Sequence, residues 1–104
     1  ALFVVSGTPE DELRRIAVRR GMMEYFVEVR GSPPGKEAIV RELIERHRLA
    51  PRRTLFIGNA LADWRAARAC GLDFLGRVAL GHASPFPKDT RIVPDLEALI
   101  SRIR

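Results

Sequence analysis

Two short groups of polar residues in the first part of the chain could bind a phosphate group. Ser6-Gly7-Thr8 directly follows an apolar run and offers a hydroxyl group and backbone N–H donors to an anionic oxygen. Lys36 opens a strongly periodic segment, where its charge opposes the helix dipole unless an anion lies nearby. Two ordinary explanations stay open at this point, a helix cap for Ser6 or Thr8 and a solvated surface lysine for Lys36.

A third group could bind a metal ion. Gly58-Asn59 follows a later apolar run, and Asp63 comes four residues after Asn59. The amide and carboxylate oxygens of Asn59 and Asp63 are hard ligands of the kind that suit Mg²⁺. The same spacing also fits an asparagine turn followed by an aspartate in the first turn of a helix. The residues alone leave both interpretations open.

The pattern around these groups predicts the elements that position them. Short apolar runs alternate with segments of helical period, which is typical of βα units and of a parallel sheet buried on both faces. We therefore predict one α/β domain over residues 1–104, with the polar groups at the carboxyl ends of its strands. The expected strands are 2–5, 25–29, 54–57, 74–78 and 91–93. The expected helices are 9–20, 36–47, 61–70 and 96–103, with Thr8 and Asp95 as N-caps of the first and last and Gly21 closing the first.

Composition narrows the classes of function. No apolar stretch approaches the roughly 20 residues of a membrane-spanning helix. The single cysteine excludes an intramolecular disulfide and indicates a reducing compartment, so we expect a cytoplasmic protein. The net charge of +5 is spread along the chain, and one Trp and one Tyr leave little aromatic surface for stacking bases. A nucleic-acid-binding domain is therefore disfavoured.

In their order along the chain, these groups resemble the second, third and fourth motifs of the haloacid dehalogenase-like hydrolases. The segments 66–72 (AARACGL) and 93–96 (VPDL) look similar to the phosphoglycolate-phosphatase-like branch. The resemblance implies a three-layer α/β/α Rossmann-like core with a mostly parallel sheet. It also implies Mg²⁺-dependent hydrolysis of a small phosphomonoester through an aspartyl-phosphate. In that reaction Ser6, Gly7, Thr8 and Lys36 would bind the phosphate, Lys36 would serve catalysis by neutralising charge, and Asn59 and Asp63 would hold Mg²⁺.

The chain departs from that family at two places. It contains no Asp-x-Asp, the first motif that supplies the nucleophile, and Asn59 stands where the family usually has aspartate. In the resembled fold the first-motif strand lies mid-sheet, between the strand ending at Ser6 and the strand ending at Gly58. We therefore expect a partial core domain that lacks its central nucleophile strand, from a truncated chain that is inactive alone. Direct pairing of residues 2–5 with 55–57 would contradict this gap.

Three functions follow from this sequence as hypotheses. The first is a part of a magnesium-dependent phosphatase. The second is a non-catalytic descendant that binds phosphate or associates with itself, since open sheet edges would allow a homodimer by strand sharing. The third, disfavoured above, is a basic nucleic-acid-binding domain.

Overall fold

A computed structural model of the chain describes residues 2–94. The predicted helix 96–103 and its N-cap Asp95 lie outside the described residues. The main elements are β1 (Phe3–Pro9), α1 (Glu10–Arg19), β2 (Glu28–Ser32), α2 (Lys36–His47), β3 (Leu55–Gly58), α3 (Leu61–Ala69), β4 (Asp73–Arg77) and β5 (Ile92–Val93). Two short 3₁₀ turns, Met23–Tyr25 and Pro51–Arg53, precede β2 and β3. This alternation confirms the predicted α/β architecture.

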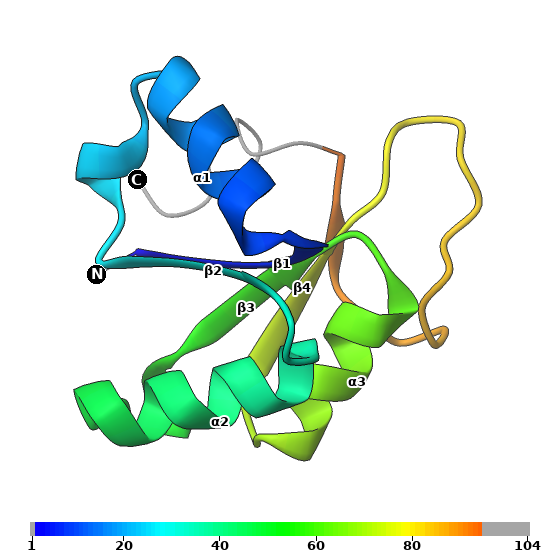
Figure 1. Cartoon of the computed structure of the whole chain (residues 1–104). Helices are drawn as coiled ribbons and strands as arrows, with labels where there is room; N and C mark the ends of the chain where they lie inside the picture. The colour runs from blue at the N-terminus through cyan, green and yellow to red at the C-terminus, as the bar shows by residue number, and fades with distance from the viewer. Residues whose placement is uncertain (1, 95–104) are drawn as a thin grey trace.

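The strands form two separate parallel sheets. One sheet pairs β1 with β2, and the other has the order β3-β4-β5. Figure 1 shows the two sheets close together at their carboxyl ends and spread apart at their other ends. Within residues 2–94, β1 and β3 do not pair with each other. The pairing that would have contradicted the predicted gap is therefore not present in the described part of the chain.

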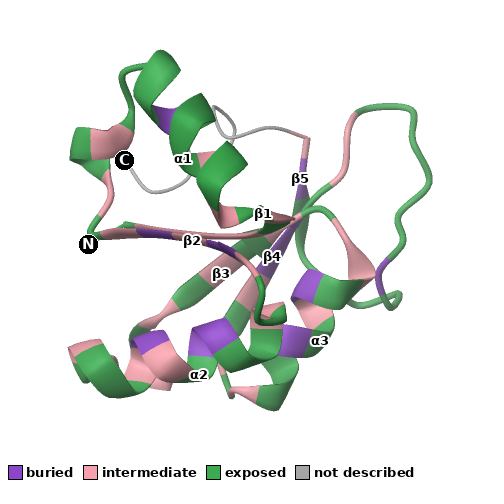
Figure 2. Cartoon of the chain, in the orientation of Figure 1, coloured by how far each residue is buried: buried purple, intermediate pink, exposed green. Residues whose placement is uncertain are grey.

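The helices cover both sides of the strands. Figure 1 shows α1 on one side of the β1-β2 sheet and α2 and α3 on the opposite side. The core contains Ile39, Val40 and Leu43 from α2, whose spacing places them on one face of that helix. Figure 2 shows the buried residues of α2 and α3 on the sides that face the strands. No helix within the described residues is long and apolar enough to span a membrane.

The start of the first helix differs from the prediction. Thr8 is not the N-cap, because β1 continues through an irregular register to Pro9, which pairs with Ser32 of β2. Pro9 itself is the residue before the first helical turn, and α1 begins at Glu10. Sheet pairing thus keeps Thr8 extended although its side chain would suit a cap. The end of the helix was predicted correctly, since Gly21 has a left-handed φ of 66°.

The second strand begins three residues later in the sequence than its apolar run indicated. The predicted range was 25–29, and β2 spans Glu28–Ser32. Tyr25 closes the 3₁₀ turn, and the strand starts at Glu28, which pairs with Phe3. It then continues through Gly31 to Ser32. Gly31 is accepted in this strand because the backbone of the β1–α1 corner lies directly against it, where a larger residue has no room. Contacts distant in sequence therefore decide the bounds of this strand.

Candidate functional site

An ion pair at the carboxyl ends of the strands forms the centre of the candidate site. Lys36 is the first residue of α2, and its Nζ lies 2.6 Å from Oδ1 of Asp63 in the first turn of α3. The side chain of Asp63 is buried, whereas that of Lys36 is 23% exposed. The lysine can therefore reach both the carboxylate and a ligand that arrives from solvent. The pair also links the first turn of α2 to the first turn of α3.

The other oxygen of Asp63 organises the turn before α3. Its Oδ2 accepts backbone N–H bonds from Asn59 and Ala60, both at 3.1 Å. Ala60 is the N-cap residue and has no side-chain acceptor of its own, so Asp63 satisfies these two donors. The close fit explains Gly58, because a Cβ at that position would lie 2.4 Å from Cβ of Asp63. The spacing of Gly58, Asn59 and Asp63 thus has a local structural reason.

The predicted phosphate-binding segment lies next to the lysine. A Cβ placed on Gly7 would lie 3.8 Å from Cε of Lys36, so the exposed backbone of Gly7 faces the lysine stem. Ser6 is half-buried, and its Oγ accepts the backbone N–H of Thr8 at 3.1 Å. The amide of Thr8 is therefore engaged inside the segment. Because the Ser6 oxygen acts as acceptor, its hydroxyl proton remains available to a phosphoryl oxygen.

The predicted metal ligands are near each other in the chain but are arranged differently. The carboxylate of Asp63 is buried and bonded, while the Asn59 side chain is exposed. No group of three His, Cys, Asp or Glu side chains that could hold a metal ion occurs within residues 2–94. One carboxylate and one amide oxygen fit Mg²⁺ in kind but fill only part of its octahedral shell. Phosphate oxygens, water or another segment would have to complete it.

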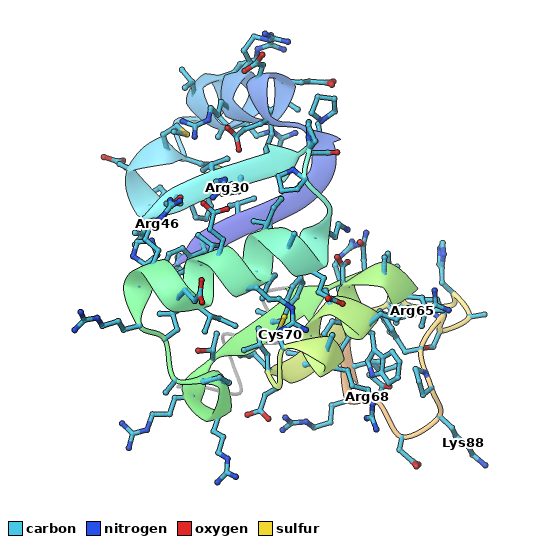
Figure 3. All side chains as sticks on the ribbon, turned by 60° about the horizontal axis from the view of Figure 1, so that its bottom comes forward. Arg30, Arg46, Arg65, Arg68, Cys70 and Lys88 are labelled. Carbon is cyan, nitrogen blue, oxygen red and sulfur yellow. The ribbon has the colours of Figure 1, made fainter. Side chains whose placement is uncertain are left out.

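A second cluster of charges beside α2 was not predicted from the sequence. Arg30 of β2 contacts Glu10 of α1 at 3.3 Å and Glu42 of α2 at 2.9 Å. Arg46 also binds Glu42 and reaches Glu28, at 2.8 Å to the nearer oxygen of Glu28. Figure 3 shows Arg30 of β2 and Arg46 of α2 on the same side of the molecule. Only the Glu42–Arg46 pair could be expected from the sequence, because residues four apart on a helix are neighbours. The other pairs join residues that are distant in the sequence and are brought together by the fold.

This cluster predicts a pH effect on stability. A hydrogen bond to His47 (2.5 Å) and the nearby Arg46 hold the pKa of Glu28 below its ordinary value of 4.5. A carboxyl whose pKa is lower in the folded state adds stability above pH 4.5, and that stability is lost as the pH falls through its folded pKa. We expect Glu28→Gln to lower the urea midpoint at pH 7 and to lose this difference from the parent as the pH falls below 4.5 through the folded pKa of Glu28. Glu45→Gln, at an exposed position on α2, the helix that carries Arg46 and His47, is the control. A Glu28→Gln deficit that stays constant with pH would contradict this role.

Comparisons with known proteins agree with the architecture. No family model and no curated protein matches the chain. Among solved structures, a haloacid dehalogenase-like family hydrolase from Streptococcus pneumoniae is similar with a TM-score of 0.81 and 19% identity, over 99% of this chain. The core domain of a protein assigned as a phosphoglycolate phosphatase from the same species has a TM-score of 0.71 and 21% identity, over 97% of this chain.

These similarities establish the fold of the chain. The chain spans about half (52%) of the first of these structures and 72% of the second. At this level of identity, shared architecture does not by itself transfer an activity. The chain has the core fold of the haloacid dehalogenase-like hydrolases, as its motifs indicated.

Proposed function

We propose that this chain, with its haloacid dehalogenase-like core fold, is part of a magnesium-dependent phosphatase that acts on a small phosphomonoester. The observation that carries the proposal is the Lys36–Asp63 pair at 2.6 Å, placed beside the backbone of Gly7. Ligands of parallel sheets bind outside the carboxyl ends of the strands, where this pair lies. A cation, a hydroxyl proton and oxygen ligands thus meet at one edge.

Each of these groups has a definite role in the proposed reaction. The Ser6 hydroxyl donates to a phosphoryl oxygen, because its own oxygen is occupied by the Thr8 amide. Lys36 is oriented by Asp63 and neutralises negative charge on the bound phosphate. The Asn59 amide oxygen, with the lone pair of the Asp63 carboxylate that its three hydrogen bonds leave free, would hold Mg²⁺, which when bound would stabilise charge on the phosphate. None of these residues is a free carboxylate that could attack phosphorus.

The nucleophile is therefore proposed to come from a strand that joins the open edges of β1 and β3. Each of these strands has one partner, β2 and β4 respectively, within the described residues. The other edge of each carries backbone groups that cost about 1–3 kcal/mol each if they are buried unsatisfied. Leu55 and Ile57, which share one face of β3, are 44% and 37% exposed, so this face of β3 is open as well as its edge. Without that strand the chain is proposed to be inactive.

The test supplies the missing strand. A hydrophobic strand ending in Asp-x-Asp is fused to the chain through a flexible linker, and phosphate release is measured on a broad panel of phosphomonoesters. We expect turnover with Mg²⁺, and none after chelation, from the chain alone, or with Asn-x-Asn in place of Asp-x-Asp. Lys36→Met should lower kcat by about 100-fold or more, whereas Arg20→Met, an exposed position on α1's C-terminal side, should not.

Amide hydrogen exchange decides how a negative result is interpreted. Protection of β1 and β3 amides in the fusion would show that the added strand has inserted. An inserted strand with no turnover on any substrate would contradict the phosphatase proposal. It would favour the second candidate, a non-catalytic protein that binds phosphate or pairs with another copy through the same open edges. Apolar residues near those edges are exposed, among them Leu2 (59%) and Leu55. This exposure supports the second candidate, because an exposed apolar surface beside an open edge favours association.

A further inference from the structure

A pocket lies between α3 and the segment 87–91, and its lining includes neither Lys36 nor Asp63. Its volume is about 350 Å³, within the range of small-molecule sites. Its lining includes Trp64 and Arg68 of α3, Phe74 of β4, and Lys88 and Arg91 of the segment 87–91. Figure 3 shows Arg68 on the helix and Lys88 on the facing loop. Trp64 follows Asp63 directly, but Asp63 is buried against Gly58 whereas Trp64 lines this pocket.

Two aromatic rings of this pocket are held in place by their neighbours. The Arg68 guanidinium lies 5.4 Å from the centroid of the Trp64 ring, in a cation–π contact. Phe74 packs edge-on against the buried Phe86, with 5.2 Å between ring centroids. Gly76 makes room for Phe86, since a Cβ there would lie 2.5 Å from the ring. The pocket therefore offers supported aromatic surface to a planar ligand.

The charge of the pocket favours an anion. Arg68, Lys88 and Arg91 line it together with a single carboxylate, Asp89. In the part of the chain that the structure describes, no carboxylate lies within ion-pair distance of any of these three cations. Arg14, Arg30, Arg41 and Arg46 are paired with glutamates, but most other described arginines are not, so it is the adjoining aromatic rings that distinguish these three cations. Unpaired cations next to aromatic rings suit a ligand that is both flat and negatively charged.

We propose that this pocket binds a small aromatic anion, a planar ring that carries a phosphate or a carboxylate. The ring stacks against Trp64 and Phe74, and the anionic group meets Lys88 and Arg91. Nucleotides belong to this class and provide a convenient probe. The site uses none of the residues assigned to the proposed phosphatase reaction and needs neither Mg²⁺ nor an added strand. It is therefore an addition to that function, and either proposal can fail alone.

The chain contains one tryptophan, so its fluorescence reports on this pocket directly. The probes are AMP, adenosine and inorganic phosphate, titrated into the full chain in the presence of a chelator. We expect a saturable change with AMP that weakens with salt, and binding at least about tenfold weaker for adenosine and for phosphate. Adenosine lacks the charge and phosphate lacks the ring, so the comparison separates the two contributions.

Variants locate the site. The double variant Lys88→Ala with Arg91→Ala should weaken AMP binding by about tenfold or more. Arg52→Ala with Arg53→Ala removes the same charge from another surface and should leave AMP binding within about twofold of the parent. If both double variants lose the same AMP affinity, the binding depends on net charge and not on this pocket, and the proposal is overturned. No saturable change up to about 5 mM AMP, or equal binding of adenosine and AMP, would also overturn it.

Discussion

Replacing Asp63 by alanine is expected to lower the free energy of unfolding by about 2–4 kcal/mol. Asp63 is only 4% exposed, and its carboxylate forms three bonds, to Lys36 and to the amides of Asn59 and Ala60. Alanine would leave two amides at the start of α3 without an acceptor and Lys36 without its partner. Because Lys36 is partly exposed, its ammonium group can turn to water, which keeps the loss below that of a fully buried charge.

Urea unfolding at neutral pH measures this loss, and Asp73→Ala provides the control. Asp73 is an exposed aspartate at the start of β4, where we expect a change of at most about 0.5 kcal/mol. Lys36→Met completes a double-mutant cycle with Asp63→Ala, in which we expect a coupling of about 1 kcal/mol or more. If Asp63→Ala costs no more than Asp73→Ala, the pair does not hold α2 and α3 together as the geometry indicates.

The sequence predicted much of this site because its signals are local. The order of Ser6-Gly7-Thr8, Lys36 and Gly58-Asn59 with Asp63 indicated the fold, which the similar structures confirm. Strand ends and helix starts adjoin in the chain, so the positions of Lys36 and Asp63 at the carboxyl edge follow from the βα pattern. The ion pair between them was not specified by the sequence. It depends on α2 and α3 packing side by side, because Lys36 and Asp63 are 27 residues apart in the chain.

The errors came from contacts that have no local signal. Thr8 has a side chain suited to a cap, but pairing of Pro9 with Ser32 extends β1 past it. The apolar residues before Glu28 indicated a strand, but a 3₁₀ turn ends at Tyr25. Arg30 gave no sign of its two glutamate partners, because Glu10 lies 20 residues away and Glu42 lies 12 residues away. Register and crossing geometry decide such pairs, and neither is encoded in a short window of sequence.

Gly31→Ala is expected to lower the free energy of unfolding by at least about 3 kcal/mol. An alanine Cβ would lie 2.5 Å from the Thr8 carbonyl oxygen and 2.6 Å from Cα of Glu10. These are main-chain atoms, which cannot rotate away as a flexible side chain could. The same corner is held by the Gly31 amide, which donates to Oε1 of Glu10 at 3.1 Å and lowers the pKa of that carboxyl. Any backbone shift that relieves the clash would also disturb this bond.

The matched control is Gly7→Ala in the neighbouring strand, where the nearest atom to the new Cβ is Cε of Lys36 at 3.8 Å. That is an ordinary contact, and we expect a change of at most about 0.5 kcal/mol. Urea unfolding of both variants gives the comparison, and hydrogen exchange of the β1 and β2 amides shows where Gly31→Ala acts. If Gly31→Ala is as stable as Gly7→Ala, the β1–α1 corner does not rest on β2 as closely as described. A large loss confined to Gly31→Ala would instead show that one missing Cβ sets how β1 and β2 meet, and so where Ser6 and Gly7 lie relative to Lys36.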